Sequence, residues 1–367
     1  MDTSSCAIFK ESIPEWYDAI NTYIELKGRY RFLRDPDYGQ ILDRFHQGRP
    51  LPSDFDTINQ RVVQRNGKTL DGDEIPEGIR YCTPNNRESD AINCGIFYKR
   101  IKDCSQDNVL ILSSKLKIKQ NRKEKQMSNI QNPQAFYQQC GENDCKFAKT
   151  QTSRMDPVLK LYYRCPVMLT NNINVDSGLA NGTEAKVLRI VMKTGQTTFK
   201  VKIDVDTHNQ FYESNQIQEV SVDAAYAEQI KFIELEHVNK NIHPKIFQLQ
   251  PKDFTFDASF PCPPEFSGRE KRIQRKMNAQ QLPVIANSAT TGHKLQGATC
   301  ENLFINAFNY RANWPYVALS RVKTLKGLYL RQPLDSSKDF SCHPKLIQMY
   351  TYFRTSKLVT DSYFDDI

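Results

Sequence analysis

Apolar residues recur along this chain with two different periods. Between residues 14 and 47 they recur every three or four positions, which predicts helix with a break near Gly28 and Pro36. From residue 165 to 235 they fall in short β-like runs punctuated by glycines, and so small an all-β unit suggests a barrel. The chain therefore combines helical and β-rich segments.

A strand followed by a helix is predicted near residue 80. Residues 79–84 form a short strand that ends at a proline, and a helix follows at 87–98. The side chains expected to face inward from that helix are Ala91, Ile92, Ile96 and Phe97. Further strands are predicted at 282–286, 302–308 and 327–330. Because strand-to-helix steps build parallel sheets, we predict an α/β domain interrupted by a small β domain.

Two stretches lack this patterning. Residues 101–155 are polar and irregular, which suggests an insertion on the surface. Residues 241–268 are rich in proline and show no periodicity.

Composition narrows the class of protein. The 367 residues are 39% hydrophobic and 25% charged, with a mean hydropathy of −0.61, and no run approaches the roughly 18 apolar residues of a membrane helix. The N-terminus has no secretory signal, so we expect an intracellular protein. The ten cysteines are scattered, which favours reduced thiols. Only Cys140 and Cys145 are spaced closely enough to suggest a metal site, and we expect none.

The net charge of +8 is concentrated locally. Six basic residues lie between Lys115 and Lys125 and five between Arg269 and Lys276, each run with a single acid. Such clusters fit contacts with nucleic-acid phosphates, and a solvated surface is the alternative.

The segment from Asn287 to Thr299 carries the most distinctive chemistry. It follows a predicted strand, so it turns at the carboxyl edge of a sheet, where α/β folds bind ligands. Its hydroxyl, imidazole, ammonium and amide groups suit phosphates and sugars, and a glycine allows close approach of the backbone. Those groups belong to Thr291, His293, Lys294, Gln296 and Gly297.

A second segment follows about twenty residues later, from Trp314 to Lys323. Apolar residues at 317, 318 and 322 suit a helix packed on the sheet, which would project Arg321 to one side. A planar, permanently charged guanidinium stabilises the charge that develops on a transferring γ-phosphoryl group.

Together the two segments resemble motifs V and VI of superfamily 1 helicases, in the Pif-one (petite integration frequency) branch with its RecD-like relatives. That family reads T-[IV]-H-K-S-Q-G and Y-V-A-L-S-R-V. This chain has Thr291-Gly292-His293-Lys294-Leu295-Gln296-Gly297 and Tyr316-Val317-Ala318-Leu319-Ser320-Arg321-Val322. The second match is complete, and the first departs at Gly292 and Leu295.

Weaker matches extend the resemblance from about residue 25 to residue 332, with 101–155 unmatched. Tyr30-Arg31-Phe32 is similar to motif IV. Cys82-Thr83-Pro84-Asn85-Asn86 with Ile92-Asn93 is similar to a C-P-T-N…I-N segment that lies against the single strand. Residues 167–172, followed by 178–183, resemble the entry to an inserted β-barrel domain.

The resemblance implies a role for each matching residue. The catalytic residues would be Arg321 and Arg31, which reach the γ-phosphate, and the ATP site would include Gln296, Gly297 and Arg321. The residues that would hold single-stranded DNA are Thr83, Asn85, Asn172, Thr291, His293 and Lys294. The implied fold is a RecA-like parallel sheet domain interrupted by a small β-barrel insert.

The sequence contains no complete G-x-x-x-x-G-K-[ST] phosphate loop. The nearest match, Gly67-Lys68-Thr69, has Val62 where the loop requires glycine, and no apolar strand precedes it. Without that loop nothing cradles a β-phosphate, and no acidic pair is placed to hold Mg²⁺. We therefore expect the chain to begin one domain too late. ATP and Mg²⁺ would then belong to the intact helicase, and this chain alone would bind neither.

Our leading hypothesis is the C-terminal half of an ATP-dependent 5′-to-3′ DNA helicase. Its expected domains are 1–165 (first part of the second RecA-like domain), 166–278 (barrel insert and connection), 279–335 (motifs V and VI) and 336–367 (C-terminal helix and acidic tail). Its expected partners are single-stranded DNA and a missing N-terminal RecA-like domain, with no membrane, in the nucleus or another intracellular compartment, the mitochondrion included. A catalytically inactive relic that binds single-stranded DNA is the alternative. An unrelated α/β enzyme ranks last, because the six histidines show no metal or triad spacing.

Overall fold

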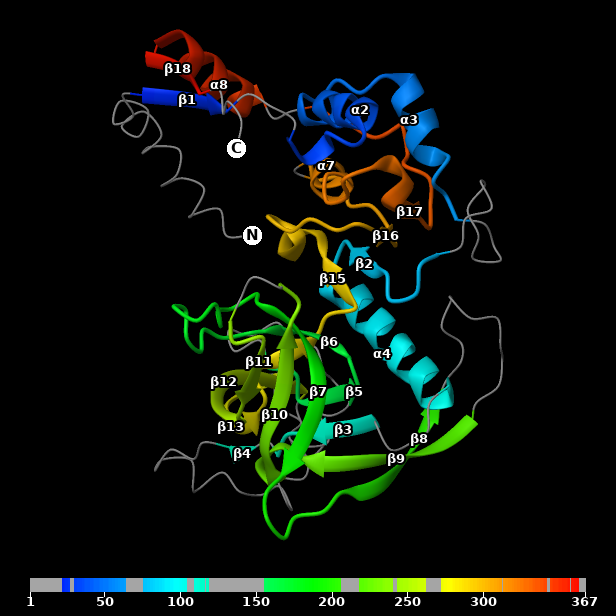
Figure 1. Cartoon of the computed structure of the whole chain (residues 1–367), viewed down its shortest axis with the longest axis vertical. Helices are drawn as coiled ribbons and strands as arrows, with labels where there is room; N and C mark the ends of the chain where they lie inside the picture. The colour runs from blue at the N-terminus through cyan, green and yellow to red at the C-terminus, as the bar shows by residue number, and fades with distance from the viewer. Residues whose placement is uncertain are drawn as a thin grey trace. The chain divides into compact units, whose positions relative to one another are not determined.

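The computed structural model describes residues 22–26, 30–63, 75–103, 109–115, 117–118, 155–205, 218–239, 243–261, 272–311, 313–341, 344–356 and 358–362. The chain divides into two compact units (Figure 1). The terminal unit contains Met1–Pro84 and Leu295–Ile367, and the inserted unit contains Asn85–Lys294. The division therefore falls near residues 84 and 294, whereas the sequence places boundaries near 165 and 278.

A parallel sheet forms the centre of the terminal unit. Strand β16 (Leu303–Ile305) pairs on one side with β2 (Arg80–Thr83) and on the other with β17 (Leu328–Leu330). Every residue of β16 and β17 is buried, as expected for a parallel sheet covered on both faces. These strands lie within the three segments in which the sequence predicts them. The structure thus has the α/β architecture with parallel strands that the sequence predicts.

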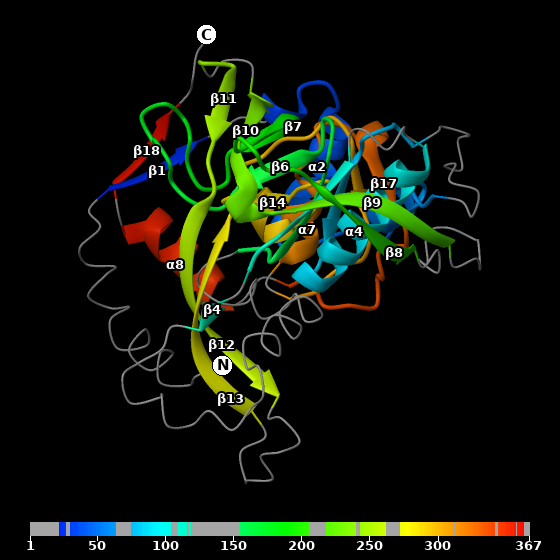
Figure 2. The same ribbon diagram turned by 90° about the horizontal axis from the view of Figure 1, so that it is seen from below.

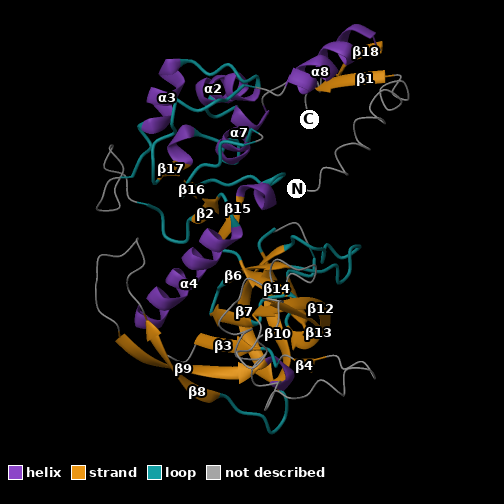
Figure 3. Ribbon diagram, turned by 180° about the vertical axis from the view of Figure 1, so that it is seen from behind, coloured by secondary structure: helices purple, strands orange, loops and turns teal. Residues whose placement is uncertain are grey.

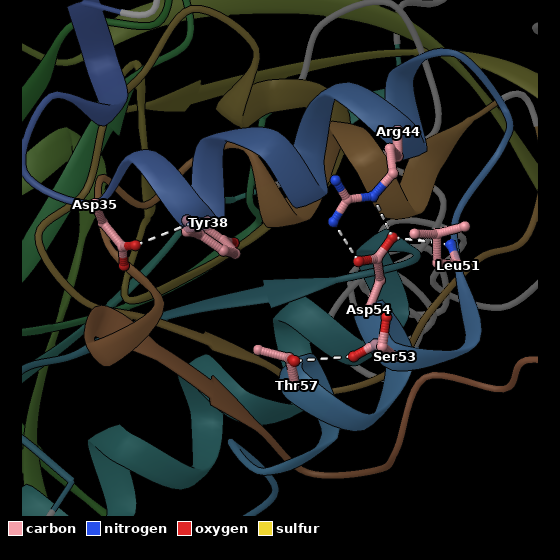
Figure 4. Close-up of polar contacts among 7 residues, drawn as sticks. All are labelled: Asp35, Tyr38, Arg44, Leu51, Ser53, Asp54 and Thr57. Carbon is pink, nitrogen blue, oxygen red and sulfur yellow. Dashed lines mark hydrogen bonds and ion pairs between the residues drawn. The ribbon is translucent and has the colours of Figure 1, made fainter.

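Short helices cover this sheet. They are η1 (Tyr30–Phe32), α2 (Pro36–His46), α3 (Pro52–Asn59), α7 (Trp314–Leu319) and η6 (Leu325–Gly327). Asp35 caps α2 by accepting the N–H of Tyr38, and Pro36 occupies the first turn, where its missing N–H costs nothing. The buried face of α2 joins one core cluster with residues of β16, α7 and β17. Figure 4 shows the guanidinium of Arg44 in α2 forking onto the carboxylate of Asp54 in α3.

The first part of the predicted 14–47 helix is wrong where the structure describes it. Thr22–Leu26 forms strand β1, which pairs in parallel with β18 (Leu358–Ser362), after helix α8 (Pro344–Ser356). Threonine, tyrosine and isoleucine in β1 favour extended backbone, and pairing with a distant strand decides between the two structures. The expected loose acidic tail is likewise a strand as far as Ser362.

The inserted unit begins with helix α4 (Asn86–Asp103), as the sequence predicts, and continues with β strands. Ile92 and Phe97 are buried as expected, but Ala91 is exposed. One sheet has the order β11-β10-β7-β6-β14, and its strands are Ile246–Leu249, Ile230–His237, Glu184–Met192, Pro166–Leu169 and Val284–Ala286. Another has the order β5-β3-β9-β8, with strands Val158–Tyr162, Val109–Ser113, Gln218–Tyr226 and Phe199–Val205.

A third sheet, of order β12-β13-β4, is dominated by a long hairpin. Strands β12 (Lys252–Pro261) and β13 (Arg272–Gln281) pair along their whole lengths, as Figure 2 shows, and β4 (Lys117–Ile118) joins β13. The two larger sheets share one apolar core. The described strands form open sheets, so the expected closed barrel is not confirmed.

Two expectations of irregular structure are wrong. The stretch 101–155 contains β3, in which Val109, Leu110, Ile111 and Leu112 are all buried. The proline-rich stretch 241–268 contains β11 and all of β12, where buried Phe254 and Phe256 alternate with exposed neighbours. Strands β3 and β11 have only five and four residues, which is too few to show a clear period in a sequence window. Among the described helices, none has the length and apolar character needed to cross a membrane.

Candidate functional site

Arg321 lies in the turn that follows α7, not on a continuing helix. The helix ends at Leu319, and the N–H of Arg321 bonds back to the carbonyl of Ala318 at 3.2 Å. The guanidinium folds over the helix end: its Nε donates to the Val317 carbonyl at 2.8 Å and its Nη2 to the Ser320 hydroxyl at 2.7 Å. The short helix thus orients the arginine through its own last carbonyls.

The same guanidinium also reaches the loop after β15 (Ala289–Thr291) and η5 (Gly292–Leu295). Its Nη1 donates to the carbonyls of Leu295 at 3.2 Å and Ala298 at 3.4 Å. Only 8% of Arg321 is exposed. Burial, and after it the positive charge of Arg31, lower the pKa of this guanidinium below its ordinary value. Within the described part of the chain no carboxylate contacts Arg321.

Arg31 joins this site from η1. Its Nη1 donates to the carbonyl of Ser320 at 3.0 Å, so both arginines bond to Ser320, Arg31 at the carbonyl and Arg321 at the hydroxyl. The hydroxyl of Tyr38, a buried residue of α2, donates to the preceding carbonyl, that of Leu319, at 2.8 Å. Two like charges therefore lie together on neutral oxygen acceptors, an arrangement suited to an anion. The structure brings together the two arginines that the sequence pairs as catalytic.

Gln296 and Gly297 are exposed in the turn whose carbonyls receive Arg321. Gly297 has φ of 82°, in the left-handed region, and the Ala298 N–H closes the turn onto Leu295 at 3.0 Å. Leu295, where the family pattern has serine, is 1% exposed and packs into the core of the terminal unit. Leucine in place of serine therefore fixes the loop to the core through its buried side chain.

The remaining part of the first motif belongs to the inserted unit. Thr291 is buried at the end of β15, whereas His293 and Lys294 are exposed in the turn that follows. Asn93 of α4 bonds to the backbone at the start of this segment: its Oδ1 accepts the Ala289 N–H at 2.8 Å. Its Nδ2 donates to the carbonyls of Ala289 at 3.0 Å and Ala286 at 3.3 Å. The sequence includes Asn93 in a motif, but its chemistry alone does not reveal this role.

Three other predicted DNA-binding residues lie in different surroundings. Asn85 is exposed and caps α4, because its Oδ1 accepts the N–H of Glu88 at 3.0 Å. Asn172 is exposed, and its Oδ1 accepts the N–H of Asn181 at 2.8 Å. Thr83 is fully buried in the terminal unit. Each assignment to DNA stays a prediction.

Several features from the sequence fall partly or wholly outside the described residues. They include the Gly67–Thr69 match, the Cys140–Cys145 pair and most of both basic clusters. Lys115 is described, and it pairs with Glu228 at 2.5 Å over the ring of Tyr226. Within the described ranges, no three metal-ligating side chains gather into one cluster, and the four cysteines described there form no disulfide.

Comparison with solved structures identifies the fold. Bacteroides Pif1 bound to ssDNA matches 88% of this chain and 54% of its own, at 13% identity and a TM-score of 0.51. The Pif1 helicase from Candida albicans matches 89% of this chain and 59% of its own, at 18% identity and a TM-score of 0.50. This chain has a Pif1-like helicase fold. The Bacteroides Pif1 complex with ADP-AlF3 and ssDNA gives 13% identity, 90% and 56% coverage, and a TM-score of 0.52.

The Pif1-like fold covers nearly all of this chain but not the whole of those helicases. The chain spans 54–59% of the length of these three structures. No family model matches the sequence. No curated protein matches it either. The likeness therefore establishes the fold, and the arginine pair and the loop before it are the features from which function is argued.

Proposed function

We propose that this chain is the second motor domain, with its β-rich insert, of an ATP-dependent 5′-to-3′ DNA helicase of the Pif1 type. Arg31 and Arg321 hold the γ-phosphate of ATP, and the turn around Lys294 holds single-stranded DNA. The proposal is supported above all by the bonding of both arginines to Ser320, Arg31 to its carbonyl and Arg321 to its hydroxyl. In the described residues nothing of opposite charge contacts Arg321.

The electrostatics favour an anionic ligand. Two guanidinium groups raise each other's free energy, and burial of Arg321 adds to that cost. Hydrogen bonds from a guanidinium to a phosphate oxygen are shorter and stronger than those to neutral carbonyls. A γ-phosphate between the arginines would therefore exchange carbonyl bonds of Arg321 for stronger ones, and it would screen the repulsion from Arg31.

ATP, when bound, supplies the phosphoryl transfer whose free energy drives movement along the strand. The residues of this chain fit one side of that ligand: the two guanidinium groups at the γ-phosphate, with Gln296 and Gly297 in the adjoining turn. In this proposal a separate first motor domain supplies the cradle for the β-phosphate and the Mg²⁺ ligands. The 367 residues of this chain contain no complete phosphate loop.

The exposed side chains of His293 and Lys294 support the assignment to DNA. They follow a buried strand, so a fixed backbone presents an ammonium and an imidazole to solvent. Asn172, on the same unit, has amide N–H groups that suit sugar or base edges. The amide of Asn85 is engaged with Glu88, its Oδ1 with the backbone N–H and its Nδ2 with the carboxylate at 2.8 Å, and it would exchange these bonds for DNA. The direction of movement rests on the sequence resemblance.

One observation favours a second candidate, a DNA-binding protein without ATPase activity. The Nε and both terminal nitrogens of Arg321 already donate hydrogen bonds within the terminal unit. An arginine that never leaves these carbonyls would stiffen the fold and would not reach a nucleotide.

The test combines DNA binding with complementation. The purified chain is titrated with fluorescent oligo-dT at several salt concentrations. It is then mixed with a separately expressed first motor domain of the Candida albicans Pif1 helicase, and ATP hydrolysis is measured. We expect binding that weakens with salt, no ATPase from the chain alone, and DNA-stimulated ATPase from the mixture that Arg321→Ala abolishes. DNA binding without ATPase in the mixture supports the second candidate. Absence of DNA binding contradicts both.

A further inference from the structure

Asn93 bridges a break between two strands of the inserted unit. Strand β14 ends at Ala286 and β15 begins at Ala289, and α4 runs beside β15 (Figure 3). From α4, the Asn93 amide bonds to the last carbonyl of β14 and to both the N–H and the carbonyl of the first residue of β15. The Asn93 side chain thus supplies hydrogen-bond partners to the backbone on both sides of the gap, as a neighbouring strand would.

The amide of Asn93 is well matched to this task. A primary amide has two N–H donors and one carbonyl acceptor, and the three bonds join them to two backbone carbonyls and one backbone N–H. Aspartate lacks both donors, and alanine lacks all three groups. The two residues in the gap are held separately, because the N–H of Asn287 bonds to Pro166 at 2.8 Å and its amide to Glu184 at 3.3 Å.

Strand β15 is only three residues long, and it leads directly to the exposed turn with His293 and Lys294. A strand of only three residues forms few backbone hydrogen bonds, so a further anchor at its start adds to the definition of that turn. We infer that Asn93 is a positioning residue: it fixes the start of β15, and through β15 it sets the place of Lys294 without contacting DNA itself. This inference rests on the proposed function, in which that turn holds the single strand.

By resemblance, the Ile92-Asn93 pair belongs to a segment that lies against the single strand, so direct contact with DNA is the alternative to a positioning role for Asn93. In this structure its amide faces protein backbone at 2.8–3.3 Å. If Asn93 contacts DNA directly, its substitution and that of Lys294 should weaken DNA binding independently. If Asn93 positions Lys294, the effect of substituting Asn93 should depend on the presence of Lys294.

The first measurement is amide hydrogen exchange on the full chain without DNA. We expect Asn93→Ala to raise exchange about tenfold in peptides covering residues 286–294, and to leave those from β12 and β13 unchanged. The matched control is Asn278→Ala in β13. This change removes one hydrogen bond, which the Thr255 hydroxyl donates to the side-chain oxygen of Asn278 at 2.9 Å. Unchanged exchange at 286–294 would overturn the positioning role whether or not the chain binds DNA.

The second measurement is a double-mutant cycle on oligo-dT affinity. We expect Asn93→Ala to weaken binding about tenfold, and to have an effect of less than about twofold once Lys294→Ala is present. Additive losses would show that Asn93 acts independently of Lys294, which contradicts the inference. If the wild-type chain binds no DNA, the proposed function fails, and the exchange measurement still decides whether Asn93 holds β15.

Discussion

The hydroxyl of Tyr38 donates a hydrogen bond of 2.8 Å to the main-chain carbonyl of Leu319, although 281 positions separate the two residues. Leu319 ends α7, and the next carbonyl, that of Ser320, accepts a bond from Arg31. Consecutive carbonyls at the end of the helix are therefore held by η1 and α2. This pairing fixes the turn from which Arg321 extends.

Tyr38→Phe should lower the free energy of unfolding of the terminal unit by about 1–2 kcal/mol, because it leaves a buried carbonyl without its donor. Urea denaturation of the full chain measures the change. The control is Tyr350→Phe in α8 of the same unit, since the Tyr350 hydroxyl makes no hydrogen bond within the described residues. An equal loss in both variants would contradict a specific role for Tyr38.

Arg321→Lys should lower the ATPase rate of the complemented motor by about 10³-fold, with DNA affinity nearly unchanged. A lysine ammonium is a point donor that cannot reproduce the planar fork of the guanidinium. Lys323→Ala is the matched control, because Lys323 is partly exposed and pairs with the exposed Glu301. Retention of activity by Arg321→Lys would argue that positive charge alone suffices.

Asp54→Asn should destabilise the terminal unit by about 2–3 kcal/mol, because it breaks a forked pair in which the carboxylate is 2% exposed. Burial pushes the pKa of Asp54 up, but hydrogen bonds from Arg44 and the Leu51 N–H outweigh it and hold the pKa below its ordinary value of 3.8. The stabilisation is therefore present above that value and is lost as pH falls through the lower pKa of the folded state.

Unfolding free energies from pH 7 to pH 3 test this sign. The gap between wild type and Asp54→Asn should narrow as the pH falls. Asp56→Asn, an exposed carboxylate on the same helix, should follow the wild type throughout. A gap that stays constant with pH would show that Asp54 stabilises by packing alone.

Alkaline pH should destabilise the inserted unit through Tyr162 and Cys165. Burial is the main cause that raises the pKa of each to about 12, from ordinary values of 10.0 and 9.0. Because the folded pKa is raised, the two groups do not destabilise the unit below their ordinary pKa values. As the pH rises from those values toward 12, they ionise more readily in the unfolded chain, and the free energy of unfolding falls. Denaturation between pH 8 and pH 11 should show a steeper loss for wild type than for Tyr162→Phe with Cys165→Ala. Tyr163→Phe, next in sequence and exposed, should keep the wild-type slope.

Two glycines of the terminal unit should respond differently to alanine. A Cβ at Gly327 would lie 2.0 Å from the Glu301 carbonyl oxygen, so Gly327→Ala should cost about 3 kcal/mol. A Cβ at Gly297 meets nothing within 4 Å, and only the φ of 82° opposes it, at about 1 kcal/mol. Thermal unfolding of the two variants measures the difference, and the reverse order would contradict the geometry.

Local sequence patterns are sufficient to predict the elements with a clear period and the order of the motifs. Strands β16 and β17 and helix α4 follow from apolar runs and helical spacing, because those patterns depend only on neighbouring residues. The pairing of Arg31 with Arg321 came from motif resemblance, and in the structure both bond to Ser320, Arg31 to its carbonyl and Arg321 to its hydroxyl.

Which partner each segment meets depends on the fold. Thr22–Leu26 becomes a strand because β18 pairs with it. Residues 109–112 alternate between two apolar cores, although polar residues flank them in the sequence. An asparagine amide has the same hydrogen-bonding groups wherever it lies, so the bridging role of Asn93 between β14 and β15 follows only from its position in the fold. Periodicity reports which face of an element is apolar, whereas the free energy of a side chain depends on contacts made by residues far away in the chain.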